Sequence, residues 1–190
     1  MRWMGLFAGV LVFLAVVTGA CGLTGAPEEA SSRVETSFGL PPHGLEAVIE
    51  SVLDGDTVSV QIGGNTETLR LLGIDTPEKA GGPRPAECHG EEATNLARDL
   101  LPVGTPVLLA RDSEPRDLYG RLLTYVYRAE DDLFVNLAML EQGAAAPLSI
   151  KPNTTFDDLF ARASADARRN NVGLWATCGQ PDLMLDAPTG

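Results

Sequence analysis

The sequence predicts an α+β domain, mainly β, in which five short strands form a small closed barrel with about three helices. Apolar and polar residues alternate in five short runs, as they do in half-buried strands. Turn residues separate the first three of these runs. Apolar residues recur at helical spacing in segments between and after the later strands.

The first three predicted strands are joined by tight turns. They cover residues 45–53, 57–62 and 67–74. Asp54-Gly55-Asp56 separates the first two, because Asp-Gly favours tight hairpin turns, and Gly63-Gly64-Asn65 separates the second from the third. Three successive strands linked in this way form a meander. Arg70 and Asp75 are expected on the third strand, with Glu78 at its end.

The remaining elements alternate between helix and strand. Helices are predicted at 87–101, 133–142 and about 156–170, and strands at 106–110 and 122–127. Thr155 is expected to cap the last helix. Tyr125 and Tyr127 are expected to divide between the core and the surface. This order of elements is typical of the OB fold, whose exposed barrel face often binds nucleic acids or sugars.

The N-terminal region is typical of an exported protein. Arg2 precedes a short apolar run, and small residues follow before Cys21. Because the run is shorter than a membrane-spanning helix needs, residues 1–20 are predicted to be a signal peptide. Residues 21–42 lack apolar periodicity and are predicted to be a flexible tether. The folded domain is expected at 43–178, with a loose C-terminal tail at 179–190.

The number of cysteines helps to predict whether Cys21 is lipidated. Three cysteines leave one over if two form a pair. Lipidation of Cys21, which follows Gly19-Ala20, would account for the odd one, and Cys88 and Cys178 could then form a disulfide in an oxidising compartment. The sequence therefore favours a cell-envelope lipoprotein held to the membrane through Cys21. Cleavage after Ala20 and release as a soluble secreted protein is the alternative.

The composition excludes several classes of protein. The 190 residues carry a formal net charge of −12, which argues against a protein that coats nucleic acid or docks on anionic lipid through bulk positive charge. Hydrophobic residues make up 44% and charged residues 21%, close to a globular average, which argues against wholesale disorder. We expect a monomer.

Three segments carry the residue types that phosphate chemistry needs. They are Asp54-Gly55-Asp56-Thr57, the stretch from Arg70 to Glu78, and Asp117-Leu118-Tyr119-Gly120-Arg121. The carboxylates suit Ca²⁺ or Mg²⁺, and the arginines suit a phosphate. Two histidines and three cysteines offer no good ligand set for zinc. Taken singly, each segment also has a structural explanation, as a hairpin turn, a helix start or a surface ion pair.

Together, these segments resemble the staphylococcal-nuclease-like (thermonuclease) family. The resemblance covers Leu45 to Trp175 and rests on the motifs Asp-Gly-Asp-Thr, Arg-Leu-Leu-x-Ile-Asp-Thr-Pro-Glu, Tyr-Gly-Arg and the later Lys151-Pro152-Asn153. It implies an OB barrel with a Ca²⁺-dependent phosphodiesterase site. The roles that it implies are calcium ligands for Asp56, Asp75 and the backbone carbonyl of Thr76, general base for Glu78, phosphate binding for Arg70 and Arg121, and contact with the terminal phosphate for Tyr119.

Three positions depart from the pattern of this family. Leu118 stands where the best-known members carry lysine, so one phosphate contact is missing. Leu148 and Ile150 stand where those members carry aromatic residues that flank the nucleotide pocket. Stacking on an aromatic ring is worth about 1–3 kcal/mol per base, so weaker substrate binding is expected.

The resemblance therefore implies a Ca²⁺-dependent endonuclease that hydrolyses phosphodiester bonds of DNA and RNA. The alternative is a catalytically silent OB-fold module that binds nucleic acid or a protein on an envelope lipoprotein. Loss of the pocket aromatics favours this alternative, whereas retention of every chemical position argues against it.

Overall fold

The computed structural model describes residues 44–185 except residue 83. The predicted signal peptide, Cys21, the tether and His43 lie outside the described residues, as does the end of the predicted C-terminal tail. Among the described residues, no helix combines the length and the apolar character needed to cross a membrane.

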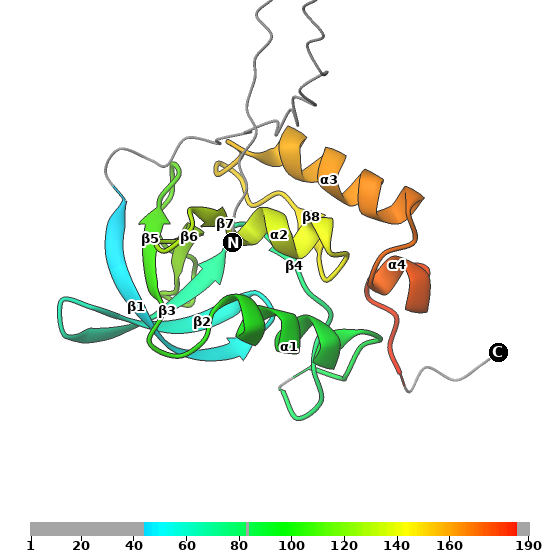
Figure 1. Cartoon of the computed structure of the whole chain (residues 1–190), viewed down its shortest axis with the longest axis horizontal. Helices are drawn as coiled ribbons and strands as arrows, with labels where there is room; N and C mark the ends of the chain where they lie inside the picture. Colours follow the sequence, from blue (N-terminus) through cyan, green and yellow to red (C-terminus); the bar gives the residue numbers. More distant parts are fainter. Residues whose placement is uncertain (1–43, 83, 186–190) are drawn as a thin grey trace, which may run out of the picture. The chain divides into compact units, whose positions relative to one another are not determined.

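Five strands form a closed barrel of mixed direction, as predicted (Figure 1). They are β1 (Leu45–Asp54), β2 (Thr57–Ile62), β3 (Asn65–Leu71), β5 (Pro106–Ala110) and β6 (Leu122–Arg128). Antiparallel pairing joins β3 to β2, β2 to β1, β1 to β5 and β5 to β6, and parallel pairing of β3 with β6 closes the barrel. The short strand β7 (Leu133–Phe134) pairs with β6. The predicted meander is thus confirmed.

The third predicted strand is broken, so the expectation of one continuous strand over residues 67–74 was wrong. After β3 ends, β4 (Gly73–Asp75) leaves the barrel and pairs with β8 (Ala146–Leu148), which the sequence did not predict. Gly73 has φ of 77°, a conformation that side chains disfavour. The ring of Phe160 lies 2.3 Å from where a Cβ of Gly73 would be, so the break also needs the missing side chain.

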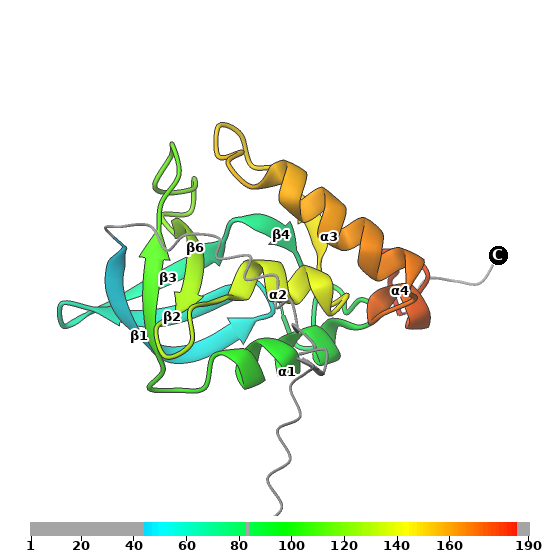
Figure 2. The same cartoon turned by 45° about the horizontal axis from the view of Figure 1, so that its top comes forward.

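The described part of the chain has four helices rather than about three. They are α1 (Gly90–Leu100), α2 (Val135–Glu141), α3 (Asp157–Arg169) and α4 (Leu174–Thr177). In both views α2 lies between the barrel and α3 (Figures 1 and 2). The first three match the predicted helices with shorter bounds, whereas α4 is too short to show periodicity. Thr155 does not cap α3: the N-cap residue is Phe156, and the Thr155 N–H donates to Oδ2 of Asp112 at 3.0 Å.

The core continues from the barrel into an aromatic cluster beneath α3. Tyr125 and Tyr127 are both buried, so the expectation that they divide between core and surface was wrong. Residues two apart on a strand share one face, and both tyrosines pack on Phe134. The ring of Tyr127 stacks on Phe134 at 4.5 Å, and the ring of Tyr125 meets it edge-on at 6.0 Å.

The C-terminal end of the described chain is tied to the start of α1. A disulfide joins Cys88 and Cys178, as the sequence suggested. The residues that follow are also bonded: the Cys88 N–H donates to the carbonyl of Leu183 at 2.7 Å, and the Leu185 N–H donates to the carbonyl of Ala86 at 3.1 Å. The structure therefore differs from a tail that is loose from residue 179 onward, because backbone hydrogen bonds extend to Leu185.

Candidate active site

An open cleft of about 940 Å³ brings together most of the residues that the sequence singled out. Six of the seven predicted site residues line it: Asp56, Arg70, Asp75, Glu78, Tyr119 and Arg121. The seventh, Thr76, is buried, and its N–H donates to Oδ2 of Asp56 at 3.2 Å. Segments far apart in the sequence therefore meet at one site.

The register of the meander places the first two of these side chains together. Asp56 ends the turn before β2, and the next residue, Thr57, pairs with Arg70 on β3. The Leu71 N–H also donates to the carbonyl of Asp56 at 2.9 Å, which fixes the turn against β3. Asp75 reaches the same place from β4, after the chain has turned at Gly73.

Arg70 is a buried cross-link at the centre of the site. Its Nη2 lies 2.9 Å from Oδ1 of Asp75 and 3.1 Å from Oδ2 of Asp56. Its Nη1 donates to two backbone carbonyls, those of Leu71 at 2.8 Å and Ile74 at 2.7 Å. The side chain is only 7% exposed. Arg70 thus links both carboxylates to the bend between β3 and β4.

The donor set at this point is made of oxygen atoms. Burial raises the pKa of Asp75, the positive charge of Arg70 lowers it, and the negative charge of Asp56 raises it again, leaving it above its usual value. Two carboxylates held this close gain from a cation between them, and carboxylate oxygens suit Ca²⁺ rather than zinc. Within the described part of the chain, no group of three or more His, Cys, Asp or Glu side chains is arranged to hold a metal. The fit to Ca²⁺ therefore rests on two carboxylates.

Glu78 lines the cleft from the segment that follows β4. Its side chain is buried and forms an ion pair with Arg84, whose own side chain is 61% exposed. The Glu78 N–H donates to Oε2 of Glu87 at 2.9 Å. Burial raises the pKa of Glu87, and the negative charge of Asp182 raises it further. The carboxyl group of Glu78 thus faces the cleft while its backbone is bonded from behind.

Arg121 also lines the cleft and is held in place by its own loop. Its Nε donates to Oδ2 of Asp117 at 2.7 Å, and its backbone N–H donates to Oδ1 of the same residue at 2.9 Å. Its guanidinium lies 5.6 Å from the ring centre of Tyr119, a cation–π contact. Tyr119 is 86% exposed. The loop therefore presents one oriented cation and one free aromatic ring to the cleft.

The three positions that depart from the family pattern also line this cleft. Leu118 is fully exposed at the tip of the loop, next to Tyr119. Leu148 and Ile150 form an aliphatic part of the wall. A base that enters here contacts aliphatic side chains at these two positions.

Sequence reasoning missed three residues that support the site. Asp117 stands inside a motif that was recognised, four residues before the arginine that it holds. Arg84 follows the Glu78 motif outside any predicted element, and Glu87 was expected only as the first residue of the helix predicted at 87–101, so no pattern marks either as a site residue. Only the fold shows that both contact Glu78.

Comparisons with known proteins agree with this geometry. The profile of the family described as Staphylococcal nuclease homologue matches residues 68–177. The chain is 33% identical over 132 residues to a thermonuclease of Staphylococcus intermedius, covering 70% of this chain and 77% of that protein. Two Bacillus subtilis proteins are also similar. The SPbeta prophage-derived endonuclease YokF is 32% identical over 136 residues, covering 71% of this chain and 45% of YokF. The endonuclease YncB is 31% identical over 136 residues, covering 71% of this chain and 64% of YncB.

The matched span begins within β3 and ends with α4, so it includes β5, β6 and the helices, whereas β1 and β2 lie before it. It holds every predicted site residue except Asp56. On the strength of this match and of the thermonuclease relative, the chain belongs to the family of staphylococcal nuclease homologues.

Proposed function

We propose that this protein is a Ca²⁺-dependent endonuclease that hydrolyses phosphodiester bonds of DNA and RNA. The observation that carries the proposal is the meeting of two carboxylates, a third acid and an arginine in one cleft. Acids alone could form a cation site, and an arginine alone could form an ion pair. Their combination, in a family whose relatives are named thermonuclease and endonuclease, supports phosphodiester hydrolysis.

Asp56 and Asp75 would hold the cation, together with the backbone carbonyl of Thr76. When bound, Ca²⁺ supplies a Lewis acid that polarises a phosphate oxygen and offsets negative charge in the transition state. Arg70 keeps the two carboxylates close together while no phosphate is bound. Its two terminal nitrogens donate three hydrogen bonds within the protein, and Nη2 also forms an ion pair with Asp56, so they can bind a phosphate only if some of these partners move.

Glu78 is the proposed general base. Glu78 lines the cleft and is not one of the two proposed cation ligands, so its carboxylate can take a proton from the attacking water once the exposed side chain of Arg84, its ion-pair partner, moves aside. Arg121 is the second proposed phosphate ligand, and its remaining N–H groups can neutralise charge that grows on the phosphate oxygens. Tyr119 beside it is proposed to contact the terminal phosphate.

The negative net charge of the chain affects how strongly it binds a nucleic acid. A net charge of −12 repels a polyanion at long range, so attraction must come from the cation and the local arginines. We therefore propose weak substrate binding and easy product release. A nanomolar Kd for DNA at physiological salt contradicts this part of the proposal.

The proposal is tested by incubating the chain from residue 22 onward with single-stranded DNA and with RNA. Hydrolysis in Ca²⁺ that stops in EDTA is the expected result. Binding without turnover, unaffected by EDTA, would instead indicate the silent binding module. The absence of hydrolysis under every cation tried would overturn the proposal.

We further propose that the protein is exported as a monomer and anchored to the cell envelope through a lipid on Cys21. The proposal rests on the N-terminal sequence and on the pairing of the other two cysteines, which leaves Cys21 over. Mass spectrometry of the mature N-terminus should find acyl chains on Cys21, and Cys21→Ala should release the protein into the medium. An unmodified N-terminus after Ala20 would indicate the soluble secreted form.

A further inference from the structure

The backbone N–H and carbonyl of Glu78 both form hydrogen bonds with one residue, Glu87, which we call the clamp. The Glu78 N–H donates to the carboxylate of Glu87 at 2.9 Å, and the Glu78 carbonyl accepts from the N–H of Glu87 at 2.8 Å. Glu87 is buried, so the hydrogen bond to its carboxylate is shielded from competing water. Both hydrogen-bonding groups of the Glu78 backbone are therefore satisfied by Glu87.

The first residue of α1, Gly90, packs against the backbone carbonyl of Glu78. A Cβ at Gly90 would lie 2.1 Å from the Glu78 carbonyl oxygen, so only glycine permits this approach. By contrast, the partner of the Glu78 side chain, Arg84, is 61% exposed and is weakly fixed by its ion pair. The position of Glu78 thus depends more on its backbone contacts than on its side-chain partner.

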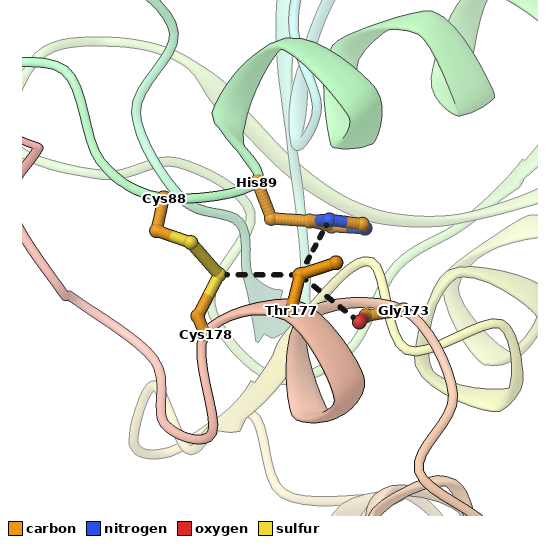
Figure 3. The surroundings of a disulfide bond; sticks show 5 residues. All are labelled: Cys88, His89, Gly173, Thr177 and Cys178. Atoms are coloured by element: carbon orange, nitrogen blue, oxygen red, sulfur yellow. Dashed lines mark hydrogen bonds between the residues drawn. A yellow bond between two sulfur atoms is a disulfide. The ribbon is translucent and has the colours of Figure 1, made fainter.

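Residues 86–88, which include the clamp, are themselves held by the C-terminal end of the described chain. Cys88 is joined to Cys178 by the disulfide, next to the contact of His89 with Thr177 (Figure 3). The two backbone hydrogen bonds to Leu183 and Leu185 flank Glu87 on either side. Glu87 therefore lies in a segment that is bonded to residues 178–185 by one disulfide and two backbone hydrogen bonds.

We infer that Glu87 is a positioning residue for Glu78, and that the disulfide-anchored residues 178–185 keep Glu87 in place. The inference rests on the proposed function, because it assigns Glu78 the role of base. A general base must be within hydrogen-bond reach of the proton that it takes, and a misplacement of about 1 Å can cost 10²-fold in rate. Glu87 acts through the backbone of Glu78 and does not line the cleft.

Two substitutions at residue 87 separate positioning from charge. Glu87→Ala removes the acceptor of the Glu78 N–H and should lower kcat about 10²-fold, with KM nearly unchanged because the substrate contacts remain. Glu87→Gln keeps a carbonyl oxygen as acceptor and should retain most of kcat. Glu92→Ala, which removes an exposed acid from α1, is the matched control and should behave as the unaltered protein.

Amide hydrogen exchange supplies a readout that does not depend on activity. In Glu87→Ala the Glu78 amide should exchange about 10- to 100-fold faster, as expected for loss of a hydrogen bond to a charged group. The amide of Val58, buried in β2, should be unaffected. The double variant Cys88→Ser with Cys178→Ser should accelerate exchange at Glu78 more than at Val58.

The outcomes separate this inference from the proposed function. If the unaltered protein is inactive, the proposed function fails, and the exchange experiment still tests the clamp. If the unaltered protein is active and Glu87→Ala keeps both kcat and Glu78 protection, the positioning role is wrong. Equal acceleration at Glu78 and Val58, or a loss in Glu87→Gln as large as in Glu87→Ala, also overturns it.

Discussion

Nη2 of Arg70 lies 2.9 Å from Oδ1 of Asp75, across the break that separates β3 from β4. The same nitrogen lies 3.1 Å from Asp56 on the neighbouring turn. Arg70 is thus part of the architecture of the site, whatever it contributes to phosphate binding.

The first prediction concerns the stability that Arg70 provides. Arg70→Ala leaves two backbone carbonyls and the buried carboxylate of Asp56 without this partner. Breaking a buried ion pair in this way costs about 3–5 kcal/mol. Urea unfolding of Arg70→Ala should show a loss of this size, and Arg162→Ala, at an exposed position on α3, should show almost none. Equal stability of the two variants would contradict the structural role.

Arg121 should behave in the opposite way, because its partner is near the surface. Its ion pair with Asp117 is partly exposed, so Arg121→Ala should cost less than about 1 kcal/mol of stability. Removal of a preorganised charge at the phosphate should lower kcat about 10²- to 10³-fold. Asp117→Asn, which loosens Arg121 without removing it, should cause a smaller loss. An Arg121→Ala variant with full activity would remove this residue from the phosphate site.

Asp112 predicts a pH dependence of stability. Burial raises the pKa of Asp112, but hydrogen bonds from the Thr155 N–H and the Tyr125 hydroxyl lower it below its usual value overall. A carboxyl group with a lowered pKa in the folded state stabilises the fold at neutral pH, and this stabilisation is lost as the pH falls through the folded-state pKa.

Asp112→Asn should therefore cost about 1 kcal/mol at pH 7 and progressively less below about pH 4. Urea unfolding at pH 7 and at pH 3 measures the difference. Asp99→Asn on the exposed face of α1 is the control and should show no such trend. A cost that is the same at both pH values would show that the charge of Asp112 does not contribute.

Leu118 offers a gain-of-function test. Leu118→Lys places a cation on a fully exposed tip beside the cleft of an acidic protein. It should lower KM and steepen the salt dependence of kcat/KM by about one phosphate contact. Val103→Lys adds the same charge at an exposed position that does not line the cleft and serves as the control. Equal effects of the two lysines would point to net charge rather than to a local contact.

The barrel was predictable because its signals are local. Asp54-Gly55-Asp56 and Gly63-Gly64-Asn65 mark both turns of the meander, and alternation marks the strands between them. The break after Leu71 was not predictable, because Leu71, Leu72 and Ile74 continue an apolar run through Gly73. Only the ring of Phe160, which comes from a helix far along the chain, shows why the strand must turn there.

The same contrast applies to the site. The site residues that the sequence predicted stand in recognisable motifs, which combine turns with charged side chains, whereas Arg84 lines the same cleft and stands in none. The residues that hold them, such as Arg84 and Glu87, act through contacts that depend on how α1 and the C-terminal segment pack. A sequence pattern carries no record of such contacts.

The most direct test of the account is the rate at which Glu78→Gln hydrolyses single-stranded DNA in saturating Ca²⁺. Glutamine keeps the size and shape of the side chain, but it has one acceptor oxygen in place of two and cannot take a proton. If Glu78 is the base, kcat should fall about 10²- to 10⁴-fold, with the fold and the Ca²⁺ affinity retained. An undiminished kcat in Glu78→Gln would contradict the assignment of Glu78 as the base.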